Sequence, residues 1–271
     1  KGRVLDADDV ARLQAAGIGE VLAARFEPGD VPEDEAAQRL AQALVSPGIR
    51  VAEAFTGRAN LFAETAGVLT LAPRAIDAVN TIDEAITLAT LPNFAAVAPG
   101  QMLATVKIIP FAAPEAALTR ASVSLAAAAP VLRLHAYRPL AARLIQTTLP
   151  GTHAKMLDKT VRITEERLRG VGGSLLGERR VARDTAALAG EIGRVLDQGC
   201  DLLLIAGASA ITDRRDVLPA GITTAGGRVE HFGMPVDPGN LLLLAWHGRL
   251  PVLGLPGCAR SPKLNGFDWV L

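Results

Sequence analysis

The sequence predicts an α/β protein with two domains: a smaller α/β domain over residues 1–129, and a three-layer αβα domain with a mainly parallel sheet over residues 130–271. In the second half, apolar runs typical of strands alternate with segments of helical periodicity. The run at 202–205 is apolar at every position, which indicates a strand buried on both faces. Strands joined by helices form parallel sheets with right-handed crossovers and covered faces.

The composition is that of a globular protein with a substantial core, since 49% of the 271 residues are hydrophobic and 21% are charged. Basic and acidic residues both number 28, and only 4% of residues are aromatic. The zero net charge and the scarcity of aromatic side chains argue against a nucleic-acid partner.

No apolar stretch reaches the length of a membrane span, and no signal peptide is visible. Cys200 and Cys258 lack metal-ligand spacing, which fits a reducing compartment. We therefore expect a cytoplasmic protein with no membrane partner. The chain begins at Lys1 without a methionine and stops at Leu271 in a continuing element, so we expect it to be a segment of a longer protein.

The first half begins with a helix that Asp6 caps, with Val10 and Leu13 on its inner face. Pro32 opens a second helix, because its fixed φ suits the first helical position. Lys107 is expected to extend from an edge strand. The predicted elements of this half are a helix to 16, a strand at 20–26, a helix from 32 to about 45, a helix at 61–66, a helix at 74–79 that continues over 80–89 after a break, a strand at 102–111 and a helix within 114–129.

The second half shows the clearer alternation, starting after a boundary near Pro130. Asp184 is placed to cap a helix whose apolar stripe includes Leu188 and Ile192. The predicted elements are strands at 140–149, 174–182, 202–205, 228–234, 241–246 and 250–255, with helices at 158–169, after 184 and after 217.

Three predicted strand ends carry loops of one chemical type, in which small residues are accompanied by a base within the loop or just after it. If their strands share one parallel sheet, the loops converge on a single crevice at the carboxyl edge. A turn with two prolines and a glycine joins them. The three loops are 147–155, 206–216 and 255–263, and the turn is 234–240.

These loops suggest two kinds of chemistry. Backbone amides together with Lys155, Arg260 and Lys263 suit a phosphate. Asp213 and Asp216 suit Mg²⁺, a general base or a heterocycle rich in N–H groups. Either acid is also acceptable as an ordinary helix cap or first-turn residue, stabilised by the helix dipole.

With these motifs in order, residues 130–271 resemble the molybdopterin-binding domain of molybdenum-cofactor biosynthesis proteins. The motifs that carry the resemblance are GASAITDRRDVLP, VDPGN and GLPGCARSP. RRDVLP resembles the molybdopterin adenylyltransferases, and the other two are more similar to the molybdopterin molybdotransferases. The first half is similar to the region that precedes this domain in proteins that often continue into a nucleotidyltransferase domain of the cytidylyltransferase type.

The chain departs from the family pattern at two places. Ala208 and Ala210 stand where glycine is common, and Cys258 and Ala259 replace the Asn and Pro of the usual last loop. Both changes lie where the resemblance places the phosphate or pterin. They imply either a variant ligand or binding without catalysis.

The resemblance also implies roles for individual residues. Asp216 matches the family's essential acid, as a catalytic group and Mg²⁺ ligand; Asp213 and Asp184 are further catalytic candidates, with an N-cap role as the alternative for Asp184. Cys258 is either a soft ligand near the dithiolene or a small residue in a tight loop. The implied cofactor-binding residues are Gly207, Ala208, Ser209, Asp237, Pro238, Gly239, Asn240, Pro256, Gly257, Cys258, Arg260, Ser261 and Lys263.

The implied function is binding of molybdopterin, or a nucleotide form of it, for a linked nucleotidyltransferase or a client molybdoenzyme. Mg²⁺ is expected as a second cofactor, ATP or CTP as further ligands, and a homo-oligomer as the assembly. One alternative is a Mg²⁺-dependent molybdopterin adenylyltransferase or molybdotransferase. Another alternative is an unrelated nucleotide hydrolase on a similar sheet.

Overall fold

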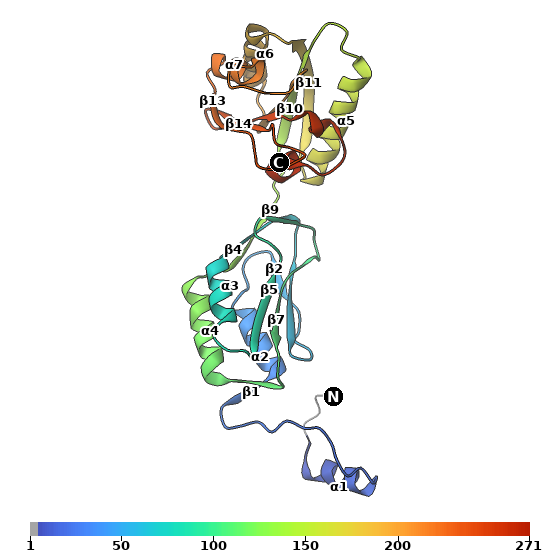
Figure 1. Ribbon diagram of the computed structural model, residues 1–271, viewed down its shortest axis with the longest axis vertical. Helices are drawn as coiled ribbons and strands as arrows, with labels where there is room; N and C mark the ends of the chain where they lie inside the picture. Colours follow the sequence, from blue (N-terminus) through green and yellow to red (C-terminus); the bar gives the residue numbers. More distant parts are fainter. Residues whose placement is uncertain (1–4) are drawn as a thin grey trace. The chain divides into compact units, whose positions relative to one another are not determined.

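The computed structural model describes residues 5–271, and the chain divides into two compact units, residues 1–137 and 138–271 (Figure 1). The sequence placed the boundary near Pro130. In the structure the first unit continues further, because strand β9 (Leu132–Ala136) pairs antiparallel with β4 (Gly67–Leu71). Both units mix helices with strands, so the expectation of an α/β protein is confirmed.

The first unit is built on antiparallel sheets. A four-stranded sheet has the order β2-β3-β7-β5, a three-stranded sheet has the order β6-β4-β9, and β1 pairs with β8. The remaining elements of this unit are α1 (Ala7–Ala15), β1 (Asp30–Pro32), α2 (Glu33–Gln42), β2 (Ile49–Val51), β3 (Arg58–Ala63), α3 (Pro73–Asn80), β5 (Ile86–Thr90), β6 (Ala95–Val97), β7 (Met102–Ile108), β8 (Ala112–Pro114) and α4 (Glu115–Ala127).

One predicted helix of this unit is a strand, and the expected continuation of another is partly a strand. Residues 61–66 were expected to be helical, but β3 alternates, with Ala59, Leu61 and Ala63 buried on one face. The helix at 74–79 was expected to continue, but it stops at Asn80. The Asn80 side chain accepts a hydrogen bond from Leu88 N at 2.7 Å and donates one to Leu88 O at 2.9 Å, which ties the helix end to β5.

Three further expectations for this unit are wrong. Residues 20–26 form no strand. Val10 on α1 was expected on the inner face but is exposed, and the buried residue of that helix is Asp9. Lys107 does not lie on an edge strand, since β7 pairs with β3 on one side and β5 on the other. Its ammonium group donates to Thr56 O at 2.7 Å.

The second unit contains one six-stranded sheet with the order β11-β10-β12-β15-β14-β13. The first four strands are parallel; β14 pairs antiparallel with β15, and β13 pairs antiparallel with β14. Its elements are β10 (Ala141–Thr148), α5 (Ala154–Gly170), β11 (Ser174–Ala182), α6 (Thr185–Gln198), β12 (Leu202–Ala206), α7 (Val217–Thr224), β13 (Arg228–Phe232), β14 (Leu243–His247), β15 (Leu250–Leu255), the 3₁₀ turn η1 (Gly257–Arg260) and α8 (Gly266–Val270).

The predicted mainly parallel, three-layer arrangement is not confirmed as stated. The second unit's sheet is mixed, and the sheets of the first unit are antiparallel. Antiparallel pairing follows where a short hairpin joins consecutive strands, as between β14 and β15. Parallel pairing occurs where the connection contains α5, α6 or α7.

Both faces of β12 are covered, as its apolar sequence indicated. Leu203 and Ile205 pack in one cluster with Leu188 of α6, and Leu204 packs in a second cluster with Leu168 of α5. All five residues of β12 are buried. The strand is therefore fixed from both sides, and so is the position of the loop that leaves its end.

The strand register brings three loops to one edge of the sheet. Gln146 of β10 is opposite Ala206 of β12, and Ala206 is opposite Leu255 of β15. Because these strands are parallel, their carboxyl ends form a row. The loops that begin after residues 148, 206 and 255 therefore start side by side, as the sequence predicted.

Candidate functional site

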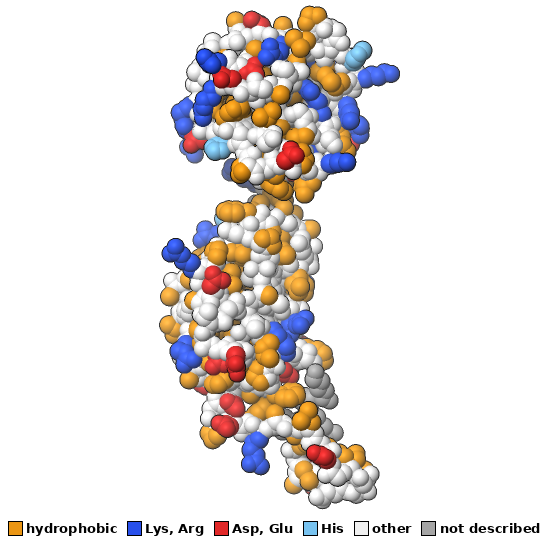
Figure 2. Space-filling model, viewed as in Figure 1, with side chains coloured by type: hydrophobic (Ala, Val, Ile, Leu, Met, Phe, Trp, Pro, Cys, Tyr) orange, Lys and Arg blue, Asp and Glu red, His pale blue; other side chains and the backbone are white. Residues whose placement is uncertain are grey.

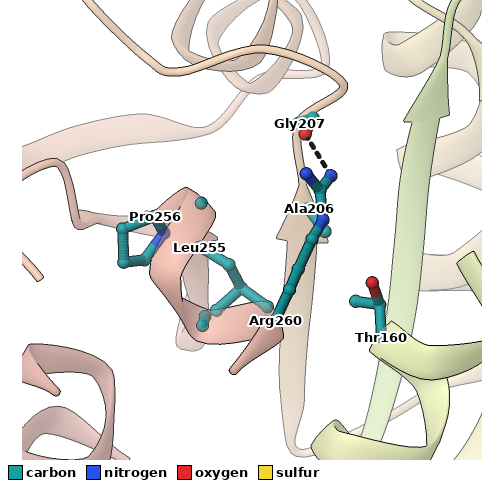
Figure 3. Close-up of a pocket in the computed structure, with 8 residues that line it drawn as sticks. Thr160, Ala206, Gly207, Leu255, Pro256 and Arg260 are labelled. Carbon is teal, nitrogen blue, oxygen red and sulfur yellow. Dashed lines mark hydrogen bonds between the residues drawn. The ribbon is translucent and has the colours of Figure 1, made fainter. Parts of the chain in front are cut away.

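A small pocket lies at the carboxyl ends of β12 and β15, with Arg260 running through it (Figure 3). Its cavity volume is about 10 Å³, which is the room that about one water needs. Apart from Arg260 and Thr160, the walls are backbone and small or apolar side chains. The lining residues are Thr160, Ala206, Gly207, Leu255, Pro256, Gly257, Ala259 and Arg260.

Arg260 is a partly buried cation that lacks an acidic partner among the described residues. Its Nη2 donates to Gly207 O at 2.6 Å, whereas its Nε is buried with no hydrogen-bond partner (Figure 3). Burial lowers the pKa of the Arg260 guanidinium, and no neighbouring charge contributes to that shift. A buried cation with unused donors is costly unless an anion offsets it.

Arg167 on α5 holds the loop that carries Arg260. Its Nη1 donates to Ala259 O at 2.7 Å, and its Nη2 donates to Ser261 O at 2.7 Å and to Lys263 O at 3.2 Å. The same guanidinium pairs with Asp268, with 2.5 Å between Nε and Oδ1. One side chain therefore satisfies three carbonyl groups and fixes the course of the loop.

The loop after β12 is tied to the end of β10 and to the residue that follows β11. Ala208 N donates to Thr147 Oγ1 at 2.8 Å. Arg183, the residue after β11, donates from Nε to Ser209 Oγ at 2.9 Å and from Nη2 to Asp216 Oδ1 at 2.7 Å. The structure thus brings Ser209 and Asp216 together through an arginine that we did not identify from the sequence.

Asp216 caps α7, as its alternative role predicted. Its Oδ1 accepts from Val217 N at 2.8 Å and from Arg183, while its Oδ2 has a long contact of 3.4 Å to Thr212 N. The carboxylate is 15% exposed. A carboxylate at a helix N-terminus is stabilised by the dipole and by the free N–H groups there.

Asp213 lies apart from this arrangement. Its Oδ1 accepts from Arg215 N at 2.7 Å and from Arg215 Nε at 3.0 Å, and both side chains are more than half exposed. The hydrogen bond from Arg215 lowers the pKa of the Asp213 carboxyl. Such a local pair on the surface adds little stability.

Asp184 is the N-cap of α6, with its Oδ1 accepting from Ala187 N at 2.8 Å. The other predicted acid of the site, Asp237, lies in the turn before β14. That turn contacts the start of α8, where Gly266 N donates to Pro238 O at 2.9 Å. Its four candidate residues, Asp237, Pro238, Gly239 and Asn240, do not line the pocket around Arg260.

We expect Asp184→Ala to lower the stability of the second unit by about 1 kcal/mol while leaving ligand binding at the Arg260 pocket unchanged. The reason is that the carboxylate caps α6 and does nothing else in the described structure. Both tryptophans, Trp246 and Trp269, lie in this unit, so urea unfolding followed by tryptophan fluorescence reports on it. Lost binding at unchanged stability would instead assign Asp184 to the site.

The remaining predicted residues differ in accessibility. Cys258 is half-buried in η1, and burial raises the pKa of its thiol, which keeps the sulfur protonated. Lys155 and Lys263 are exposed. On the face shown in Figure 2, the basic side chains of the second unit are spread out and interspersed with hydrophobic and acidic ones.

The described residues gather no set of protein ligands for Mg²⁺. Within residues 5–271 no three His, Cys, Asp or Glu side chains gather where they could hold a metal ion. Asp216 is paired with one arginine and Asp213 with another. Mg²⁺ requires oxygen ligands with free lone pairs in near-octahedral geometry.

In the part of the chain that the structure describes, residues 5–271, no helix is long and apolar enough to cross a membrane.

Arg183 and Arg167 were missed for different reasons. Arg183 follows the predicted strand at 174–182 directly, so its position at a carboxyl strand end was a usable signal. Arg167 lies in the middle of a helix, and its partner Asp268 is 101 residues away in the sequence. No local pattern marks such a pair.

Comparisons with protein-family models and with curated proteins found no match. Among solved structures, the chain is similar to a molybdopterin biosynthesis MoeA protein from Pyrococcus horikosii, at 17% identity and a TM-score of 0.37 over 89% of this chain and 78% of that one. It is also similar to a molybdenum cofactor biosynthesis protein B, at 15% identity and a TM-score of 0.37 over 50% of this chain and 92% of that one. A third is the tungsten cofactor synthesizing protein MoaB from Pyrococcus furiosus, at 16% identity and a TM-score of 0.33 over 46% of this chain and 87% of that one.

Proposed function

We propose that the second unit binds molybdopterin, or a nucleotide form of it, through the ligand's phosphate at the carboxyl edge of β10, β12 and β15. The observation that carries this proposal is the partly buried guanidinium of Arg260, whose Nε has no partner in a pocket without an acid. The protein acts as a cofactor-binding module for a linked nucleotidyltransferase or a client molybdoenzyme.

A phosphate is the anion that this pocket suits. The planar guanidinium offers parallel N–H donors that match two phosphate oxygens. The pocket is walled by Gly207 and Gly257, and small residues allow a ligand to approach the backbone closely. Because the cavity now has room for about one water, the Arg260 side chain shifts when the phosphate enters.

The pterin part of the proposal rests on the motifs. GASAITDRRDVLP and GLPGCARSP begin at the ends of the neighbouring strands β12 and β15, and the pocket lies between their first residues. Binding without catalysis is the form we favour, because Asp213 and Asp216 are both engaged with arginines. Adenylyl transfer and nucleotide hydrolysis are therefore outcomes that the test below must detect or reject.

The test is calorimetric titration of molybdopterin into the wild type and Arg260→Ala. Loss of a charged hydrogen-bond donor is expected to weaken binding by at least about tenfold. Arg249→Ala is the matched control, because Arg249 is an exposed arginine in the hairpin before β15, at the opposite end of that strand. Its affinity is expected to equal that of the wild type.

The same samples, mixed with ATP or CTP, are assayed for pyrophosphate and free phosphate. Absence of turnover agrees with a binding module. Pyrophosphate release that needs molybdopterin would establish an adenylyltransferase or cytidylyltransferase instead, and phosphate release without the pterin would establish a nucleotide hydrolase. Wild-type protein that fails to bind molybdopterin would overturn the proposal.

A further inference from the structure

Asp216 already has a cation opposite it, and that cation is an arginine of this chain. Arg183 Nη2 lies 2.7 Å from Asp216 Oδ1, and the pair is mostly buried, with the two side chains 30% and 15% exposed. Hydrogen bonds between ionised groups at such distances are the strong ones. A divalent metal bound to Oδ1 would have to displace the guanidinium, and one bound to Oδ2 would have to share the carboxylate with it.

The second hydrogen bond of Arg183 fixes its orientation. Its Nε donates to Ser209 Oγ at 2.9 Å, and its backbone N–H donates to Thr148 O at 2.8 Å. The side chain therefore spans from the end of β11 to both ends of the loop between β12 and α7. A planar guanidinium held by two partners loses little further rotamer freedom when a ligand binds.

Arg183 still has donors to offer. Five N–H groups belong to a guanidinium, and in residues 5–271 those of Arg183 make only the two bonds just described. Because the side chain is 30% exposed, its unused N–H groups reach solvent. They are free to bind oxygens of an anion that enters at this edge of the sheet.

We propose that Arg183 is the fixed cation of this edge, and that the site binds its phosphorylated ligand without a divalent metal. The arginine supplies the positive charge that a metal ion supplies in a carboxylate-metal-phosphate arrangement, while Asp216 orients it. The identity of the ligand rests on the proposed function. The arrangement of Arg183, Ser209 and Asp216 does not depend on that identity.

The first test uses Mn²⁺ as a paramagnetic stand-in for Mg²⁺ and needs no organic ligand. We expect the signal of free Mn²⁺ in electron paramagnetic resonance to be unchanged by the full chain. Stoichiometric Mn²⁺ uptake that disappears in Asp216→Asn would overturn the proposal, because it would make Asp216 a metal ligand. This outcome is independent of whether molybdopterin binds.

The second test titrates molybdopterin in excess EDTA and again in Mg²⁺. The wild type is expected to give dissociation constants that agree within about twofold. Arg183→Ala is expected to weaken binding at least about tenfold in both buffers, and Arg183→Lys to recover part of the loss, because it keeps the charge. Asp216→Asn is expected to weaken binding less than Arg183→Ala does, because Asn still caps the helix and still offers an oxygen to Arg183, although the negative charge that orients the guanidinium is lost.

Arg180→Ala is the matched control for the loss of one positive charge. Arg180 lies on the same strand, β11, and pairs with Glu178 and Asp158 instead. We expect it to bind as the wild type does. Binding that requires Mg²⁺, or that Asp216→Asn abolishes while Arg183→Ala leaves it intact, would refute the role of Arg183. A wild type that binds no molybdopterin refutes the proposed function, and the Mn²⁺ result still decides whether Asp216 is a metal ligand.

Discussion

Arg167→Ala is expected to destabilise the second unit by about 3–5 kcal/mol, the usual loss when one partner of a buried ion pair is removed. The Arg167 side chain is 8% exposed and its partner Asp268 is 19% exposed, so the carboxylate would be left without its cation. The carbonyls of Ala259, Ser261 and Lys263 would lose their donors as well.

The measurement is urea unfolding followed by tryptophan fluorescence, which reports on this unit. Arg162→Ala is the matched control: Arg162 lies on the same helix and pairs with Glu166 at 3.2 Å, but both side chains are exposed. We expect that control to change stability by less than about 0.5 kcal/mol. Equal effects of the two substitutions would show that burial does not decide the strength of these pairs.

Phe267→Ala is also expected to have a large effect: it should lower the free energy of unfolding of the second unit by about 3–5 kcal/mol, because the ring fills the core between α8 and the sheet. Phe267 is fully buried and packs in the cluster that contains Leu144 and Leu204. The Arg167 guanidinium lies over the Phe267 ring, with 5.6 Å between its central carbon and the ring centroid. The two substitutions are therefore expected to be non-additive.

Trp269→Ala is the control on the same short helix. Its side chain is 62% exposed, so its loss leaves no cavity, and we expect a change within about 0.5 kcal/mol. Trp246 remains as the fluorescent probe in that variant. If Trp269→Ala proved as damaging as Phe267→Ala, α8 would be packed differently from the structure described here.

Both predictions concern the rigidity of the loop that carries Arg260. Arg167 donates hydrogen bonds to carbonyl groups of this loop, and Phe267 anchors α8, the helix that follows the loop. A ligand that binds a preorganised loop avoids the entropic cost of ordering it. We therefore expect variants at either position to bind ligand more weakly even at temperatures where the unit stays folded.

Local sequence patterns determined the positions of many helices and strands in the second unit. The strands at 174–182 and 250–255 have the predicted bounds, and Asp184 caps its helix as its position indicated. The expected row of loops after β10, β12 and β15 is present in the structure. Caps, turns and buried apolar runs depend on adjacent residues, so one sequence carries enough information to place them.

Only the tertiary structure decided the rest, because it depends on partners that are far apart in the chain. The alternation of Ala59, Leu61 and Ala63 has meaning only once β3 lies against β7. Arg183 and Asp216 are 33 residues apart, and Arg167 and Asp268 are 101 apart. The sequence supplied the charged groups of the site, but packing decided which of them are paired and left Arg260 without an acidic partner in residues 5–271.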